Sequence, residues 1–295
     1  MLAVVGDLIE DVVVWPAGAL RSGTDNKADI YRTRGGSAAN VAAFAASRYA
    51  TRFIGCVGDD AIGEHLSRLL EADGVDIRLQ RKGTSGTIVI LIEPDGERTM
   101  LPNRGAATQL EQIPADWLSG VELLHVPAYS FDGSPLRETV ESMIVTVRKQ
   151  GGAISIDTSS TQVIESFGAA AFLDYIEELR PEYLIANNDE ADLLGLGVGS
   201  DVEPILRRLW DTTVVLKAGA NPTRILRVGR DALVIPVPPV ALVRDSTGAG
   251  DAFAAGFLAS LLLTGDLKEA AVGGHASAAL VLASPGATAG IPAIS

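Results

Sequence analysis

Residues 245–251 read Asp-Ser-Thr-Gly-Ala-Gly-Asp, and their types and spacing are the best suited to chemistry in this chain. A glycine-rich turn before a helix-favouring run can present unpaired backbone N–H groups, which attract phosphate or a developing oxyanion. A carboxylate there would repel phosphate, but it can serve as the base that takes a proton from the attacking nucleophile. The segment therefore predicts phosphoryl transfer with Asp251 as base, although a plain helix cap would use the same residues.

The same segment matches neither of two common nucleotide-binding fingerprints. It is not a Walker A loop, because no Gly-Lys-Ser/Thr follows it. It is not a dinucleotide fingerprint either, because Phe253 occupies the third glycine position after Gly248 and Gly250. Support for a phosphate site has to come from other parts of the chain.

A second pattern, Arg-Gly-Gly-Ser-Ala-Ala-Asn, occupies residues 34–40. Its paired glycines would let another group approach the backbone closely, and Asn40 follows Gly36 by one helical turn. An amide side chain at that place can both donate to and accept from a polyhydroxyl ligand. Tight packing of a helix made of small residues explains the same pattern, and both interpretations stay open at this point.

Two polar clusters follow predicted strands. Asp11 comes a few residues after the first strand, at the end where α/β sheets bind ligands. Residues 187–190, Asn-Asn-Asp-Glu, follow a later strand in the same way. A carboxylate and an amide there are suited to holding Mg²⁺ through water beside phosphates. Each could also be a helix cap, but together these clusters favour a site at the carboxyl ends of the strands.

The elements that must position these residues alternate between short apolar runs and helical patterns. The pattern predicts buried strands at residues 2–5, 53–57, 123–126, 153–156, 183–186 and 214–216. It predicts helices at residues 37–49, 62–73, 135–149, 168–180, 190–194, 202–210 and 252–263. Strand and helix alternation of this kind indicates a parallel sheet that is covered on both faces.

Two regions break that alternation. Residues 11–14 and 28–34 look extended with no helix between them, and residues 77–80, 86–92 and 98–101 form a second such group with a turn at 94–96. Such strands do not fit inside a doubly wound sheet. They predict a small β lid, the alternative being that they extend the main sheet.

Composition narrows the function classes. The net charge of −13 argues against a nucleic-acid partner, which needs clustered Lys and Arg. The single cysteine, Cys56, excludes an internal disulfide and fits a reducing compartment. The histidines His65, His125 and His275 lack metal-ligand spacing. No signal peptide and no membrane-length apolar run is evident, so we expect a soluble, cytoplasmic protein with no membrane contact.

These motifs resemble those of the ribokinase-like sugar kinases, the phosphofructokinase B (PfkB) family. The resemblance covers nearly the whole chain, in the family's order and at its usual separations. It is carried by Gly35-Gly36-Ser-Ala-Ala-Asn40, Asn187-x-x-Glu190, Lys217-Ala-Gly219 and residues 245–251. It implies a three-layer α/β/α sandwich with a doubly wound, mostly parallel sheet and a small β-strand lid. Residues 1–295 would form one kinase domain, with the lid at about residues 11–34 and 77–101.

The resemblance also implies a reaction and its residues. ATP would phosphorylate a hydroxyl, expected to be primary, of a small sugar or sugar derivative. Asp251 would be the catalytic base, with an anion hole at Gly248, Ala249 and Gly250. Sugar contacts are implied for Asp11, Gly35, Gly36 and Asn40. Nucleotide contacts are implied for Asn187, Lys217, Gly219, Thr247, His275 and Ser277. Mg²⁺ would be organised through water by Glu190, and a monovalent cation such as K⁺ by Asp245, Thr247 and Gly286.

The chain departs from the family pattern at two places. Asn221-Pro222 follow Lys217-Ala-Gly219 where many members carry a second glycine, which predicts a differently shaped nucleotide loop. Residues 98–104 do not match the ribokinase pattern, and Arg104 could enter the pocket from the lid side as a substrate contact. Hexoses, sugar acids and nucleosides therefore stay open beside ribose.

Three other functions remain to be weighed. A nucleoside kinase of the same superfamily would need an aromatic wall, which Tyr31, Tyr129 and Phe131 could supply. A non-catalytic sugar sensor is disfavoured by the intact Asp251, and a nicotinamide oxidoreductase by the lack of a dinucleotide fingerprint. Exposed edges of lid strands often pair between two chains, so a homodimer through the lid is expected.

Overall fold

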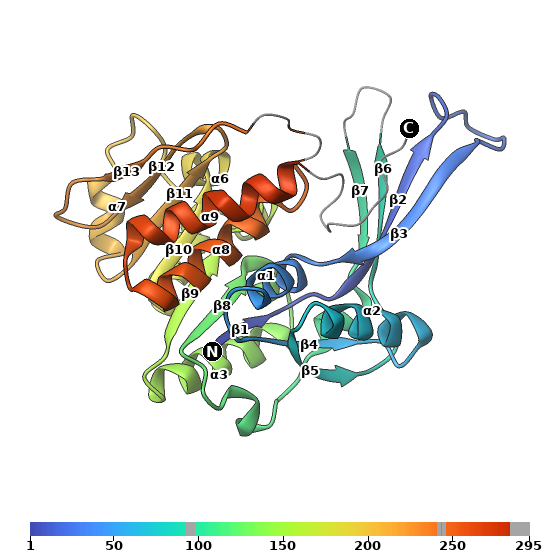
Figure 1. The fold of residues 1–295 in the computed structure, drawn as a ribbon, viewed down its shortest axis with the longest axis horizontal. Helices are drawn as coiled ribbons and strands as arrows, with labels where there is room; N and C mark the ends of the chain where they lie inside the picture. The colour runs from blue at the N-terminus through green and yellow to red at the C-terminus, as the bar shows by residue number, and fades with distance from the viewer. Residues whose placement is uncertain (93–97, 241–242, 244–245, 284–295) are drawn as a thin grey trace.

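The computed structural model describes residues 1–92, 98–240, 243 and 246–283. Their strands form a nine-stranded sheet and a separate four-stranded sheet (Figure 1). In the larger sheet the strands from β11 to β5 are parallel, whereas β12 and β13 are antiparallel additions at one edge. Its spatial order is β13 (Leu233–Ile235), β12 (Asn221–Leu226), β11 (Thr213–Ala218), β10 (Tyr183–Asn187), β9 (Ala153–Asp157), β8 (Leu123–Pro127), β1 (Leu2–Val5), β4 (Thr51–Val57) and β5 (Asp76–Arg81).

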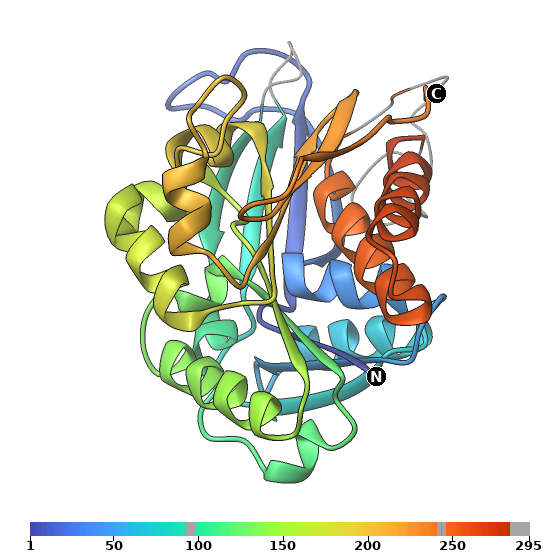
Figure 2. The ribbon, with the colours of Figure 1, turned by 90° about the vertical axis from the view of Figure 1, so that its left-hand side faces the viewer.

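Helices cover both faces of this sheet (Figure 2). One face packs on α1 (Ser37–Ala46), α2 (Ala61–Ala72), α8 (Ala249–Thr264) and α9 (Leu267–Leu282). The other packs on α3 (Leu136–Lys149), α4 (Thr161–Phe167), α5 (Ala169–Leu179), α6 (Asn188–Leu193) and α7 (Glu203–Arg208). Strand β1 shows why helices are needed on both faces. Its side chains Leu2 and Val4 pack in the hydrophobic core on one face, and Ala3 and Val5 pack in the core on the other. Side chains alternate across a strand, so a strand that is buried on both faces is apolar throughout.

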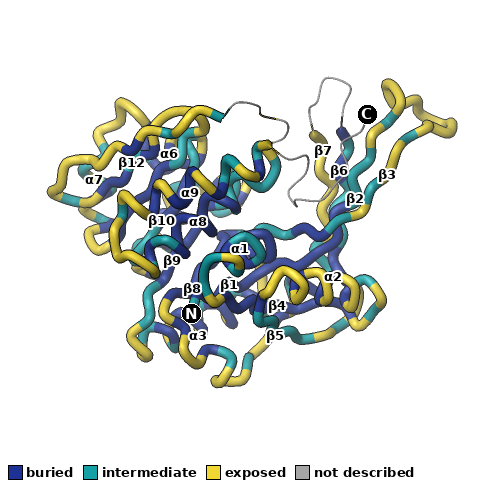
Figure 3. Tube along the Cα trace, in the orientation of Figure 1, coloured by how far each residue is buried: buried dark blue, intermediate teal, exposed yellow. Residues whose placement is uncertain are grey.

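The smaller sheet is built from the lid segments and stands beside the main sheet (Figure 1). Its order is β3 (Ala28–Gly35), β2 (Ile9–Pro16), β6 (Thr87–Ile92) and β7 (Arg98–Asn103). The outer part of the β2–β3 hairpin is exposed, whereas the end nearest the main sheet is buried (Figure 3). The turn expected at residues 94–96 lies outside the described residues.

One strand expected in the lid belongs to the main sheet. Residues 77–80 lie in β5, which pairs in parallel with β4 through partners such as Phe53 and Ile77. The turn after α2 is the physical reason, because Gly74 with φ 85° returns the chain directly alongside β4. The alternative interpretation, an extension of the main sheet, is therefore correct for this segment.

Short 3₁₀ turns complete the described structure at Gly105–Gln109, Ala115–Leu118 and Ala128–Phe131. No helix among the described residues is long and apolar enough to cross a membrane. The two connections that matter most are short: Gly6 to Leu8 lead from β1 into β2, and Gly36 alone separates β3 from α1. Residues at these two connections therefore lie where the two sheets meet.

Candidate active site

The first turn of α8 holds the acidic residue of the first motif. Gly248 is the N-cap with φ 75°, a left-handed conformation that glycine adopts without strain, and the helix begins at Ala249. Asp251 therefore lies in the first turn, where backbone N–H groups have no partner within the helix. Gly250 keeps space open beside it, since a Cβ there would lie 3.3 Å from Lys217 Nζ.

The second motif supports this carboxylate from the opposite helix. Ser37 Oγ donates to Asp251 Oδ1 over 2.7 Å, and Asn40 Nδ2 donates to Asp251 Oδ2 over 3.0 Å. Gly36 permits this approach, because it has φ 98° and a Cβ there would lie 2.3 Å from the Asp7 carbonyl oxygen. The structure thus brings the two motifs together, more than two hundred residues apart in sequence.

Burial sets the proton affinity of Asp251. Desolvation raises its pKa to about 6, while the hydrogen bonds from Asn40 and Ser37 act in the opposite direction. The negative charge of Asp157 also raises this pKa, and the positive charge of Lys217 lowers it. A carboxylate with this pKa is largely ionised near neutral pH and is a stronger base than an exposed aspartate.

Asp11 lies at the lid end of the same region. Its carboxylate packs on Gly35, where a Cβ would lie 2.2 Å from Asp11 Cγ. Burial raises the pKa of Asp11 to about 7, the positive charge of Arg34 lowers it, and the charge of Asp251 raises it further. The ionisation of Asp11 therefore responds to the charge of Asp251.

Arg104 follows lid strand β7 and pairs with Asp7, a residue that sequence reasoning missed. Its Nε and Nη2 each donate over 2.7 Å to the two oxygens of Asp7, which follows β1. Its Nη1 also lies 3.4 Å from Asp132 Oδ2, an exposed carboxylate. Asp7 comes directly after the first strand, so the signal that selected Asp11 could also have found it.

The phosphate end contains a buried ion pair. Lys217 Nζ lies 2.7 Å from Asp157 Oδ2, and the two side chains are 16% and 8% exposed. Asp157 ends β9 and was not selected from the sequence, although it follows a predicted strand like the other clusters. Because Lys217 also lies near Gly250, its ammonium can face an anion bound at the α8 N-terminus.

Asn187 and Glu190 form a reciprocal cap at the start of α6. Glu190 N donates to Asn187 Oδ1, while Glu190 Oε2 accepts from Asn187 N over 2.8 Å and from Thr158 Oγ1 over 2.5 Å. Glu190 Oε1 accepts from Asn187 Nδ2 over 2.7 Å. Burial is the largest cause that raises the pKa of Glu190. The cap expected as an alternative is present, and its carboxylate lies close to the Asp157–Lys217 pair.

The remaining predicted nucleotide and cation residues are more scattered. Gly219 has φ 59° at the turn after β11, and Thr247 precedes the cap of α8. His275 and Ser277 are buried in α9, where His275 Nε2 lies 2.8 Å from Thr223 Oγ1. Asp245 and Gly286 lie outside the described residues.

The aromatic residues weighed for a nucleoside wall differ in position. Phe131 is fully buried in the core, and Tyr31 lies in lid strand β3. Tyr129 is half-buried in the turn after β8, and its pKa is raised mainly by burial, with the charges of Asp251 and Glu190 acting in the same direction. Tyr129 is therefore the aromatic residue that shares the site.

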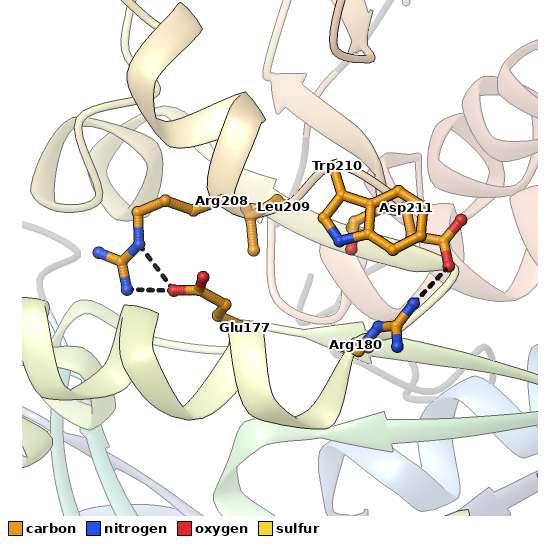
Figure 4. A pocket seen from close by; sticks show the side chains of 7 residues that line it. Glu177, Arg180, Arg208, Leu209, Trp210 and Asp211 are labelled. Carbon is orange, nitrogen blue, oxygen red and sulfur yellow. Dashed lines mark hydrogen bonds and ion pairs between the residues drawn. The ribbon is translucent and has the colours of Figure 1, made fainter.

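Two surface hollows lie apart from these groups. The one in Figure 4 lies between the end of α5 and the loop after α7 and is lined by an Arg208–Glu177 ion pair and by Arg180 over the Trp210 ring. A broader hollow of about 630 Å³ lies along α3. Neither of these two hollows is lined by a residue of the two motifs.

Comparisons with known proteins all identify kinases as similar to this chain. A family described as "pfkB family carbohydrate kinase" matches residues 1–294. An ATP-dependent ribose-1-phosphate kinase of Halopiger xanaduensis is 32% identical over 273 residues, covering 89% of this chain and 86% of the relative. An aminoimidazole riboside kinase of Salmonella typhimurium is 28% identical over 277 residues, covering 88% and 84%. The solved adenosine kinase of Sinorhizobium meliloti superposes with a TM-score of 0.84 at 21% identity, covering 99% and 96%, which confirms the expected fold.

Proposed function

The chain belongs to the pfkB family of carbohydrate kinases and phosphorylates a sugar with ATP, and we propose that Asp251 is the base of this reaction. One observation carries the proposal: the partly buried Asp251 carboxylate lies in the first turn of α8 and is held by Ser37 and Asn40 of the other motif. A carboxylate at this position would repel an anion bound at the start of the helix, and a role as proton acceptor explains why an acidic residue stands there.

The mechanism follows from this placement. An aspartate cannot deprotonate an alcohol in advance, so Asp251 accepts the proton while the new O–P bond forms. The backbone N–H groups of Gly248, Ala249 and Gly250 would donate to the transferring phosphoryl group, that of Ala249 by giving up its bond to the Ser246 carbonyl oxygen. Lys217 would add positive charge beside Gly250. Loss of one such donor typically raises the barrier by about 3 kcal/mol. The lid strands cover the acceptor and exclude water, which limits hydrolysis of ATP.

Mg²⁺ fits this site through water. Both oxygens of Glu190 already accept hydrogen bonds, which suits Glu190 to orienting water rather than binding a metal directly. Among the described residues no group of three or more His, Cys, Asp or Glu side chains is arranged to hold a metal ion. We infer that Glu190 and Asn187 order water around an ion held by ATP, where the ion would neutralise phosphate charge.

Replacement of Asp251 by Asn tests the base. The variant keeps the size of the side chain and removes the proton acceptor, so kcat should fall by about 10²–10⁴-fold. Binding of ATP and of the acceptor, measured by calorimetry, should persist. Near-normal turnover in Asp251→Asn would contradict the assignment, whereas a loss of both binding and activity would indicate a folding defect.

The acceptor is chosen at the other end of the site. Asp7, Asp11 and Arg104 present carboxylates and a guanidinium that can bind sugar hydroxyls, together with the backbone at Gly35 and Gly36. We propose a small sugar or sugar derivative that is phosphorylated on a primary hydroxyl. The acceptor can be identified by measuring ADP release with a panel of pentoses, hexoses, sugar acids, sugar phosphates and nucleosides.

A nucleoside acceptor is the second candidate. Tyr129 favours it, because this half-buried ring follows β8, feels the charge of Asp251, and could stack on a base. The relative that acts on aminoimidazole riboside supports the same candidate. Faster ADP release with nucleosides than with free sugars would decide for it, and Tyr129→Ala should then raise KM for the nucleoside alone.

Four finer assignments complete the proposal. Gly219, Thr247, His275 and Ser277 contribute to the nucleotide side, His275 and Ser277 through packing of α9 rather than from an exposed face. K⁺ would be bound by Asp245, Thr247 and Gly286, which predicts higher activity with K⁺ than with an equal concentration of choline. The protein is cytoplasmic. It is a homodimer through the lid, whose edge strands β3 and β7 carry exposed Ile30, Met100 and Leu101.

A further inference from the structure

Arg34 is the first residue of the second motif, and it is buried although no role in the site has been assigned to it. It lies one residue before the end of β3, is 4% exposed, and sits between the lid and the first turn of α1. Its Nη1 donates to Asn40 Oδ1 over 3.2 Å, and its Nη2 donates to Asp73 Oδ2 over 3.2 Å. Removing a guanidinium from water costs free energy, so its hydrogen bond to Asn40, which lies beside Asp251, needs an explanation.

The contact with Asn40 fixes the direction of an amide. An arginine can only donate hydrogen bonds, so it must face the oxygen of the Asn40 side chain. The opposite edge of that amide, Nδ2, is then turned toward Asp251 Oδ2, which can only accept when ionised. The series of hydrogen bonds from Arg34 through Asn40 to Asp251 therefore allows only one orientation of the Asn40 amide. Asp73, the C-cap of α2, holds the other side of the Arg34 guanidinium.

The charge of Arg34 also reaches both carboxylates of the site. Its positive charge lowers the pKa of Asp11, and the charges of Asp73, Asp11 and Asp251 oppose the fall that burial causes in the pKa of Arg34. Arg34 shares the surroundings of Asp251 with six other groups: Ser37 and Asn40 from α1, Asp11 from β2, Asp157 from β9, Lys217 from β11 and Tyr129 from the turn after β8. Only Lys217 and Arg34 among these bear positive charge, and Lys217 is paired with Asp157.

We propose that Arg34 is a positioning residue for phosphoryl transfer, which holds the Asn40 amide against Asp251 and keeps positive charge beside the base. The proposal rests on the proposed role of Asp251 and adds a residue that does not touch either substrate. Without Arg34 the Asn40 amide could flip, and Asp251 would lose both a fixed hydrogen bond and a nearby cation.

Three variants test it by kinetics. Arg34→Met should lower kcat at least about 10-fold and move the acidic limb of the pH profile of kcat/KM upward, with KM for ATP nearly unchanged. Arg34→Lys keeps the charge but lacks the planar fork, so kcat should fall while the limb stays in place. Arg52→Met is the matched control, because Arg52 is a buried strand arginine that pairs with Asp76 and contacts neither motif. It should leave the limb unchanged.

Carboxyl titration separates this proposal from the role of the base. With ¹³C-labelled aspartate, NMR should show a higher pKa for Asp251 in Arg34→Met than in the wild type, whatever the activity. If Asp251→Asn is fully active but this shift occurs, the base assignment fails and the positioning by Arg34 stands. An unchanged Asp251 titration and unchanged kcat in Arg34→Met overturn the proposal. If Arg34→Met does not fold, an unchanged kcat in Arg34→Lys overturns it.

Discussion

At the scale of single residues, proton affinity is the property that most directly links this structure to a rate. Burial raises the pKa of Asp251 to about 6, and the base must be ionised to accept a proton. We therefore expect log kcat/KM to rise with pH and to level off above about pH 6. Steady-state rates from pH 4.5 to 8.5 at saturating Mg²⁺ measure this, and a limb centred near pH 4 would contradict it.

The same ionisation has a consequence for stability. The pKa of Asp251 is about 6 in the folded state, above the value of about 4 for an unfolded chain. The native state then holds more protons between these pH values, so this group's contribution to the free energy of unfolding falls as pH rises from 4 to 6. Asp251→Asn lacks that loss, and its Tm relative to wild type should increase from pH 4.5 to pH 7.

Single residues also show what sequence reasoning can find. Asp11 and Asp251 were selected because they follow a strand or a glycine turn, and in the fold the charge of Asp251 raises the pKa of Asp11. Asp7 and Asp157 follow strands in the same way but were missed. Their partners Arg104 and Lys217 are 97 and 60 residues away, and such pairing has no local signal.

At the scale of elements, α8 uses its glycines for two different purposes. A Cβ on Gly256 would lie 2.3 Å from the Gly273 carbonyl oxygen and 2.3 Å from Ser277 Oγ, so this glycine lets α8 and α9 pack closely. A Cβ on Gly250 would meet only the flexible end of Lys217, at 3.3 Å. The first position serves helix packing, and the second keeps space open beside the Lys217 ammonium.

Alanine at each position should separate these purposes. Gly256→Ala overpacks the helix contact and should lower the free energy of unfolding by about 1–3 kcal/mol. Gly250→Ala should keep stability within about 1 kcal/mol of wild type but lower kcat, because the methyl group displaces Lys217. Urea unfolding and steady-state rates of both variants measure the difference. Equal losses of stability would contradict the argument.

At the scale of the whole molecule, the lid sheet presents its edges outward. Strands β3 and β7 form these edges, and Ile30 and Met100 are 60% and 52% exposed. Edge strands with exposed apolar side chains are suited to pairing with a second copy. We expect sedimentation velocity to show a dimer that Ile30→Asp with Met100→Asp converts to a monomer. Val272→Asp, an exposed position on α9, is the control that should remain dimeric, and a monomeric wild type would contradict the proposal.

The sequence by itself determined the family, the parallel order of strand and helix, and the residues of both motifs. These are local properties, because glycine spacing, apolar periodicity and the residues after each strand can be recognised within short stretches of sequence. Only the tertiary structure decided that β5 joins the main sheet and that Asn40 bonds Asp251. It also decided that Asp7 and Arg34 share the site. The physical reason is that strand partners and buried ion pairs depend on distances between segments far apart in sequence, which no local pattern encodes.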